Sequence, residues 1–100
     1  MNNILNEIRA ERAAQDRKWG QQDHNPIEWI AILTEEVGEA AKEAVDFHFY
    51  NGLSGQSPLE KRSIRYERLM AYRKELIQVA AVSVSMIESL ERYLQDIVEP

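Results

Sequence analysis

The sequence predicts an all-α fold, a bundle of three to four helices per chain that is completed by homo-oligomerisation. Apolar residues recur at helical spacing in three segments, and no segment alternates as a β-strand does. Two of the segments open with the same start signal, a capping residue followed by a proline and a glutamate. The 100 residues fit a single domain over 1–100. A domain of this size buries only about 60–65% of its unfolded surface, so pairing with a copy would enlarge the core.

The first helix is predicted over residues 3–18. This segment is rich in Glu, Arg and Ala, and it places Ile4, Leu5 and Ile8 at helical spacing before it turns polar. The pattern breaks at Trp19-Gly20, so the helix should end there.

The second helix is predicted to start at Pro26. Asn25 is a good capping residue, proline suits the first helical position, and Glu28 can complete a capping box. An apolar stripe follows at helical spacing and comprises Trp29, Ile30, Leu33, Val37, Ala40, Ala44 and Phe47. The pair Asn51-Gly52 favours a left-handed stop and should end the helix.

The last helix is predicted from Pro58, after the cap Ser57, to about residue 97. Its apolar stripe comprises Leu69, Tyr72, Leu76, Val79, Ala80, Val82, Met86, Ile87, Leu90 and Leu94. An unbroken helix of this length would extend about 60 Å, which is long for a small domain. A kink or a split between Ser63 and Tyr72 therefore stays open, and a split would supply a fourth helix.

Composition excludes several classes of function. A formal net charge of −5, with acids spread along the chain, argues against a polynucleotide-binding protein. The absence of cysteine excludes disulfides, thiolate metal sites and cysteine nucleophiles. The sequence shows no secretion signal and no apolar run that could span a membrane, so we expect a cytoplasmic protein without a membrane partner.

Acidic residues occupy positions that a helical core should keep apolar. Glu36 projects into the stripe of the second helix, and Glu39 lies one turn later at its edge. Glu75 shares a face of the last helix with Val79 and Val82. An unpaired buried carboxylate costs several kcal/mol or takes up a proton, so such a cluster needs positive charge. Carboxylate oxygens suit the hard cations Mg²⁺, Mn²⁺ and Ca²⁺.

A structural alternative explains part of this pattern. Glu35, Glu39, Glu43 and Asp46 would then form a solvated acidic edge, which is common on helices. The alternative does not account for Glu36 and Glu75, because both fall on core faces.

These acids carry a resemblance to a known family. Glu35-Glu36-x-x-Glu39 followed by Glu75-x-x-Gln78 resembles the two-part signature, EExxE and then ExxD, of the MazG-type all-α nucleoside triphosphate pyrophosphohydrolases. The resemblance extends over roughly residues 17–90. The chain departs from the pattern in two ways, because Gln78 replaces the aspartate of the second motif and the interval between the motifs is longer.

The resemblance implies hydrolysis of a nucleoside triphosphate, or a related nucleotide, to the monophosphate and pyrophosphate with Mg²⁺ or Mn²⁺ as cofactor. It implies that Glu36, Glu39 and Glu75 bind the metal and that Gln78 is a weak ligand or orients one. Glu35, with Glu36, would serve catalysis, either by holding a second ion or by accepting a proton from the attacking water. The implied assembly is a homodimer or a homotetramer.

Basic and aromatic side chains are candidates for binding the substrate. Lys42, Arg65 and Arg68 could contact phosphates, although such side chains more often pair with neighbouring acids. Trp19 and Gln22 could contact the base, although a tryptophan at a helix end is more often a packing residue. Two other functions stay open, a nucleotide-binding protein with weak catalysis and a purely structural bundle.

Overall fold

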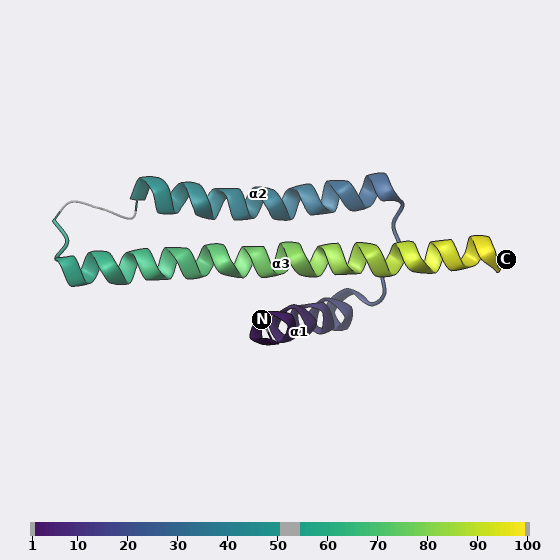
Figure 1. The fold of residues 1–100 in the computed structure, drawn as a ribbon. Helices are drawn as coiled ribbons and strands as arrows, with labels where there is room; N and C mark the ends of the chain where they lie inside the picture. The colour runs from purple at the N-terminus through teal and green to yellow at the C-terminus, as the bar shows by residue number, and fades with distance from the viewer. Residues whose placement is uncertain (1, 51–54, 100) are drawn as a thin grey trace.

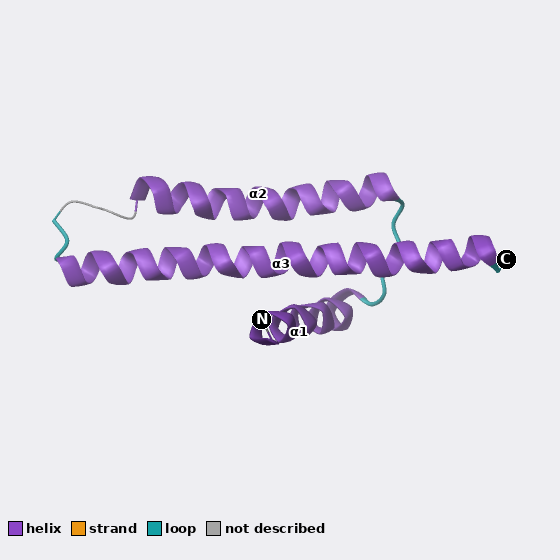
Figure 2. Ribbon diagram, viewed as in Figure 1, coloured by secondary structure: helices purple, strands orange, loops and turns teal. Residues whose placement is uncertain are grey.

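The computed structural model describes residues 2–50 and 55–99. This part of the chain forms three helices, α1 (Asn2–Trp19), α2 (Pro26–Tyr50) and α3 (Pro58–Val98), as Figures 1 and 2 show. Helices α2 and α3 run antiparallel as a hairpin, and α1 also packs against α3. The prediction of an all-α fold is confirmed.

Both predicted start signals cap their helices. The Glu28 backbone N–H donates to Oδ1 of Asn25 at 2.9 Å, and the Asn25 backbone N–H donates to Oε1 of Glu28 at 3.0 Å. At the start of α3, the Ser57 hydroxyl accepts from the Glu60 backbone N–H at 3.1 Å. Each cap satisfies backbone donors that have no partner inside the helix, so local sequence sets where α2 and α3 begin.

Helix α3 is continuous through the segment in which a kink or a split was left open. Residues 63–72 contain neither proline nor glycine and consist mostly of good helix formers, so nothing interrupts the backbone ladder. With 41 residues against 25 in α2, α3 is about 60 Å long and α2 about 37 Å. The C-terminal end of α3 therefore projects past the start of α2 (Figure 1). The predicted stop at Asn51-Gly52 lies outside the described residues.

Ion pairs join helix α1 to α3. Arg73 donates to both carboxylate oxygens of Glu7, at 2.7 and 2.5 Å, and Arg12 donates to Oε1 of Glu88 at 2.9 Å. Ile4 and Leu5, which the sequence placed on the apolar face of this helix, are exposed. Ile8, the third predicted apolar residue, is half-buried, so the face of α1 that meets α3 combines this side chain with the ion pairs.

The connection from α1 to α2 is bonded to α3 through the carboxylate of Asp23. Gly20, at φ 72°, ends α1 in the left-handed conformation that glycine adopts without strain. Oδ1 of Asp23 then accepts from the buried Ser89 hydroxyl at 3.1 Å and from Nε of Arg92 at 3.0 Å. Arg92 also donates to the backbone carbonyl of Gln22 at 3.3 Å. These bonds fix the point at which the chain enters α2.

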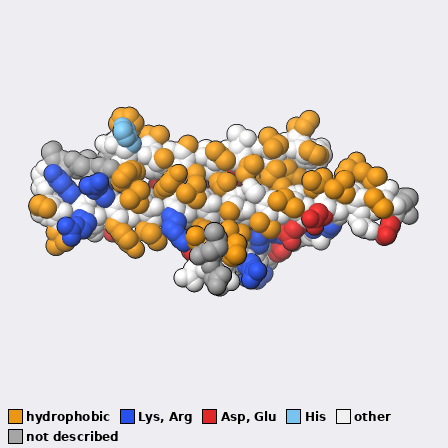
Figure 3. Space-filling view, viewed as in Figure 1, with side chains coloured by type: hydrophobic (Ala, Val, Ile, Leu, Met, Phe, Trp, Pro, Cys, Tyr) orange, Lys and Arg blue, Asp and Glu red, His pale blue; other side chains and the backbone are white. Residues whose placement is uncertain are grey.

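The apolar core of the described chain is thin. Its buried apolar residues are Trp29, Ala40, Ala81 and Val82, together with the buried polar residues Ser85 and Ser89. Val37, Leu76 and Leu94 belong to the predicted apolar stripes but are exposed (Figure 3 shows such side chains along the hairpin). The radius of gyration is 17.7 Å, against about 13 Å for a compact domain of this length. The stripes were therefore predicted correctly as apolar surfaces, but the chain covers them only in part.

No helix in the described residues combines the length and the apolar content that crossing a membrane requires.

Candidate metal centre

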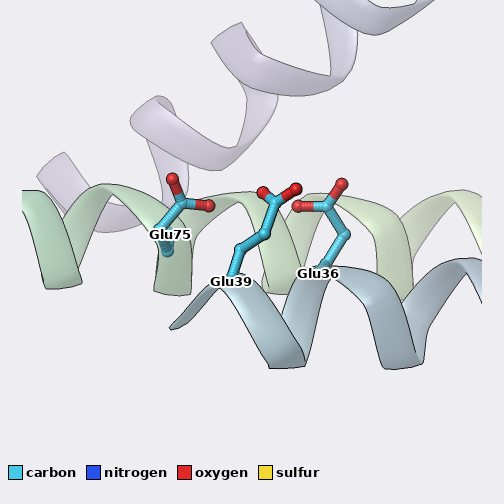
Figure 4. A group of neighbouring side chains, drawn as sticks. All are labelled: Glu36, Glu39 and Glu75. Carbon is cyan, nitrogen blue, oxygen red and sulfur yellow. The ribbon is translucent and has the colours of Figure 1, made fainter. Parts of the chain in front are cut away.

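Three carboxylates from two helices meet between α2 and α3. Glu36 and Glu39 project from α2, Glu75 projects from α3, and one oxygen of each lies within 4.8 Å of the others (Figure 4). Glu36 and Glu75 are half-buried and Glu39 is exposed, so the cluster opens to solvent on the Glu39 side. The structure thus brings together the acids that the sequence placed on facing helix surfaces.

Gln78 belongs to the same site. When its amide nitrogen faces the carboxylates, Nε2 donates to Oε2 of Glu36 at 3.2 Å and to Oε2 of Glu75 at 3.3 Å. The amide thereby offsets part of the repulsion between two acids on different helices. If the amide rotated, its oxygen could face a cation. An aspartate at position 78 would offer an oxygen in either orientation, because both of its terminal atoms are oxygens.

The electrostatics of the cluster favour a bound cation. Burial raises the pKa of Glu36, and the charges of Glu39 and Glu75 raise it further. Burial also raises the pKa of Glu75, with added contributions from the charge and hydrogen bond of Glu39 and the charge of Glu43, whereas Lys74 lowers it by a smaller amount. In the metal-free protein, burial and neighbouring negative charges therefore disfavour the ionised form of both carboxyl groups. A set of carboxylate oxygens fits a hard divalent cation such as Mg²⁺, Mn²⁺ or Ca²⁺, and Glu36, Glu39 and Glu75 are the residues that would hold it.

We expect the stability of the metal-free protein to depend on pH in a direction set by Glu36 and Glu75. Because their folded pKa values are raised, the folded state holds their protons more tightly than the unfolded state does. Their contribution is present below the ordinary glutamate pKa and is lost as pH rises through the raised values. Added Mg²⁺ should restore stability at neutral pH but not at acidic pH. Melting curves from acidic to neutral pH, with chelator or with Mg²⁺, measure this.

Two other acids, Glu7 and Asp23, make the stability depend on pH in the opposite direction, so the experiment must control for them. The hydrogen bond from Arg73 lowers the pKa of Glu7, and bonds from Gln21 and Arg92 lower that of Asp23. Both contributions are lost as pH falls, whether or not metal is present. The informative quantity is therefore the difference between the two melting curves at each pH. A difference that does not grow towards neutral pH would contradict a role for Glu36 and Glu75 in binding the ion.

The remaining predicted catalytic residue lies beside the cluster rather than in it. Glu35 is exposed and is not one of the three acids whose oxygens converge. Its charge raises the pKa of Glu36, so the two side chains do interact.

The predicted phosphate contacts are spread along the hairpin. Lys42 and Arg65 are exposed, and Arg68 is half-buried. On α3, Arg68 precedes Glu75 by about 10 Å along the helix axis and Arg65 by about 15 Å. Arg65 lines a pocket of about 350 Å³ with Lys61 and Arg62. Of the two arginines, Arg68 therefore lies closer than Arg65 to Glu75 along α3.

The predicted base contacts lie at the end of α1 and just beyond it. Trp19 is exposed, with Nζ of Lys18 4.6 Å from the ring centroid. Gln22 is half-buried, and its backbone carbonyl accepts the bond from Arg92. The binding roles of both residues stay predictions.

One residue that acts on the site was not among the predicted site residues. Glu11 of α1 is half-buried, and its charge raises the pKa of Glu36. In Figure 4, α1 passes on the side toward which the carboxylates point. Helical spacing places Glu11 on the face of α1 that carries Ile4 and Ile8, but it does not show which part of the hairpin that face meets. Glu43, which the structural alternative placed on a solvated edge, is half-buried and acts on Glu75 through its charge.

The chain matches no protein-family model, and comparisons with curated proteins and with solved structures also found no match.

Proposed function

We propose that this chain is a cytoplasmic, metal-dependent nucleotide pyrophosphohydrolase of the MazG type, which converts a nucleoside triphosphate to the monophosphate and pyrophosphate. The observation that carries the proposal is the meeting of Glu36, Glu39 and Glu75 within 4.8 Å. The order of the two acidic motifs along the chain supports it.

When bound at this site, Mg²⁺ or Mn²⁺ would neutralise phosphate charge and lower the pKa of the attacking water. Glu36 and Glu39 would hold the ion from α2, and Glu75 would hold it from α3. Water forms a bond to the α-phosphorus while the bond from that phosphorus to the bridging oxygen breaks, and pyrophosphate leaves. Glu35 accepts the proton of the water or holds a second ion, and Lys42, Arg65 and Arg68 contact the phosphates. Trp19 and Gln22 contact the base.

The proposal is tested by incubating purified protein with a panel of ribonucleoside and deoxyribonucleoside triphosphates in Mg²⁺, Mn²⁺ or chelator. We expect metal-dependent release of pyrophosphate from at least one nucleotide and none in chelator. A panel that yields no pyrophosphate with either metal would overturn the proposed activity.

Gln78 favours a second candidate, a nucleotide-binding protein with weak turnover. The amide donates to two acids that would otherwise repel each other, so the metal-free site is partly satisfied and gains less from an ion. Calorimetry that detects metal-dependent nucleotide binding without pyrophosphate release would select this candidate over the first.

Gln78→Asp is expected to bind Mg²⁺ about tenfold more tightly and to be less stable without metal. The change removes two hydrogen bonds and adds a fourth negative charge to the cluster, and adding a carboxylate strengthens a site for a hard cation. Titration calorimetry measures the affinity, and thermal melting in chelator measures the stability. Gln78→Ala is the matched control, because it removes the hydrogen bonds without adding charge. Equal Mg²⁺ affinities in the two variants would show that position 78 does not contact the ion.

A further inference from the structure

A basic pocket of about 350 Å³ lies at the start of α3. Among the described residues, its lining consists of Pro58, Lys61, Arg62 and Arg65, so it combines three cationic side chains with no acidic one. Figure 3 shows basic side chains gathered at this end of the molecule, where Figure 1 places the first turns of α3. The whole chain carries a formal net charge of −5, so this concentration of positive charge is a local feature.

The acidic residues of the same segment lie on the other side of the helix. Helical spacing places Glu60 and Glu67 on the face opposite the three cations. In the described part of the chain, no acid forms an ion pair with Lys61, Arg62 or Arg65, although three other arginines are paired with acids. The charge of the pocket is therefore not neutralised by these parts of the chain.

The three cations are also held close together. Lys61 and Arg65 are four residues apart and Arg62 and Arg65 are three apart, so the Cβ atoms of each pair lie about 5–6 Å from each other. Like charges at this spacing destabilise a helix. A bound anion would remove the repulsion, and an arginine can hold a phosphate group through two parallel hydrogen bonds.

The charge of the pocket indicates which anion suits it. A single phosphate monoester carries about 1.5–2 negative charges at neutral pH, fewer than the three positive charges of the lining. Two or more linked phosphates match these charges better. A polynucleotide fits less well, because its binding depends on many phosphate contacts over an extended basic surface, whereas these three side chains fall within five residues of α3.

We propose that the basic pocket is a second anion-binding site, which takes a ligand with at least two linked phosphates, either free pyrophosphate or the phosphate chain of a nucleotide. Lys61 and Arg62 lie about 20 Å from Glu75 along the axis of α3, so they are separate from the clustered carboxylates. Binding at the pocket therefore needs no metal ion. The site does not rest on the proposed hydrolase activity.

Titration calorimetry with pyrophosphate in chelator tests this site. Lys61 and Arg62 are the residues to change, because Arg65 is also assigned to the substrate phosphates of the metal centre. The unmodified chain should bind pyrophosphate, and the double variant Lys61→Gln, Arg62→Gln should bind it at least about tenfold more weakly, because charge-assisted hydrogen bonds are lost. The double variant Arg9→Gln, Arg17→Gln is the matched control, since it removes the same charge from exposed positions of α1, and it should bind as the unmodified chain does. No binding in chelator, or equal losses in the two double variants, would overturn the proposal.

Protection of lysines from acetylation locates the bound anion on the unmodified chain. The sequence contains four lysines, Lys18, Lys42, Lys61 and Lys74, and mass spectrometry can follow each of them. Pyrophosphate in chelator should slow the acetylation of Lys61 and leave that of Lys18 unchanged. Protection of Lys42 without protection of Lys61 would place the anion at the metal centre and overturn the proposal.

The same protection assay identifies the source of the phosphates. If a nucleoside triphosphate in chelator protects Lys61 at a lower concentration than pyrophosphate does, the ligand is a nucleotide; if pyrophosphate acts at the lower concentration, the ligand is the free anion. Either result supports the proposal. A single-stranded DNA oligonucleotide without terminal phosphates that protects Lys61 at a lower concentration than both would overturn it in favour of a polynucleotide.

Discussion

Replacing Glu36 with glutamine is expected to stabilise the metal-free protein and to lower pyrophosphate release at least about 100-fold. The amide keeps the shape of the side chain but removes the half-buried charge whose pKa is raised by burial and by Glu39 and Glu75. Each kcal/mol gained raises the melting temperature of a domain of this size by roughly 4–8 °C. The variant also lacks one of the proposed metal ligands. Mutating a residue that only hydrogen-bonds to a metal ligand typically lowers metal affinity or activity by about 10–100-fold, so loss of a ligand itself should cost at least as much.

The diagnostic result is the opposite sign of the two effects, measured by thermal melting in chelator and by a pyrophosphate assay with Mg²⁺. Glu67→Gln is the matched control, since Glu67 is exposed on α3 about 12 Å along the axis from Glu75. It should change neither quantity. A Glu36→Gln variant that keeps full activity would remove Glu36 from the proposed mechanism.

Trp29→Ala is expected to destabilise the protein by about 3–5 kcal/mol, which is a large part of the 5–15 kcal/mol that holds a typical domain folded. Trp29 is only 4% exposed, and it is the one large side chain among the buried apolar residues described. The rings of His24 and Trp29 pack in a T-shaped arrangement, with centroids 4.8 Å apart. The indole Nε1 has no hydrogen-bond partner in the described residues, so the expected loss comes from packing. Chemical denaturation measures it.

Trp19→Ala is the matched control, because it makes the same change at a side chain that is 56% exposed. This variant should lose no more than about 1 kcal/mol of unfolding free energy, which is the expected value of the exposed cation–π contact with Lys18. Similar losses in the two variants would contradict the assignment of Trp29 to the core. Because Trp19 is a predicted base contact, the same variant can be assayed for nucleotide binding.

Local signals in the sequence predicted the parts of the fold that depend on neighbouring residues. Asn25 with Glu28, and Ser57 with Glu60, form their caps within one helical turn, so no tertiary information is needed to place them. The meeting of Glu36 with Glu75 was also predictable, because each acid interrupts an apolar face and apolar faces of neighbouring helices pack together.

The rest depends on contacts that periodicity does not encode. The docking of α1 includes ion pairs such as Glu7 with Arg73, and a charged residue in a helical pattern gives no sign of its distant partner. The effect of Glu11 on the carboxylates was missed because helical spacing gives a face of α1 but not the part of the hairpin against which that face packs. Periodicity also cannot show whether an apolar stripe is covered by its own chain, which is why Val37 was expected in the core but is exposed.

The charged attachment of α1 makes its docking sensitive to ionic strength. Pairs such as Arg73 with Glu7 are partly exposed and therefore weaken as salt shortens the Debye length, about 10 Å at 0.1 M, whereas apolar contacts between α2 and α3 do not. Amide protons of α1 should accordingly exchange with solvent faster at high salt than those of the hairpin. Release of α1 would also move the charge of Glu11 away from Glu36, which would lower the raised pKa of Glu36. High salt would therefore change the titration of the cluster through a helix that provides none of its three acids.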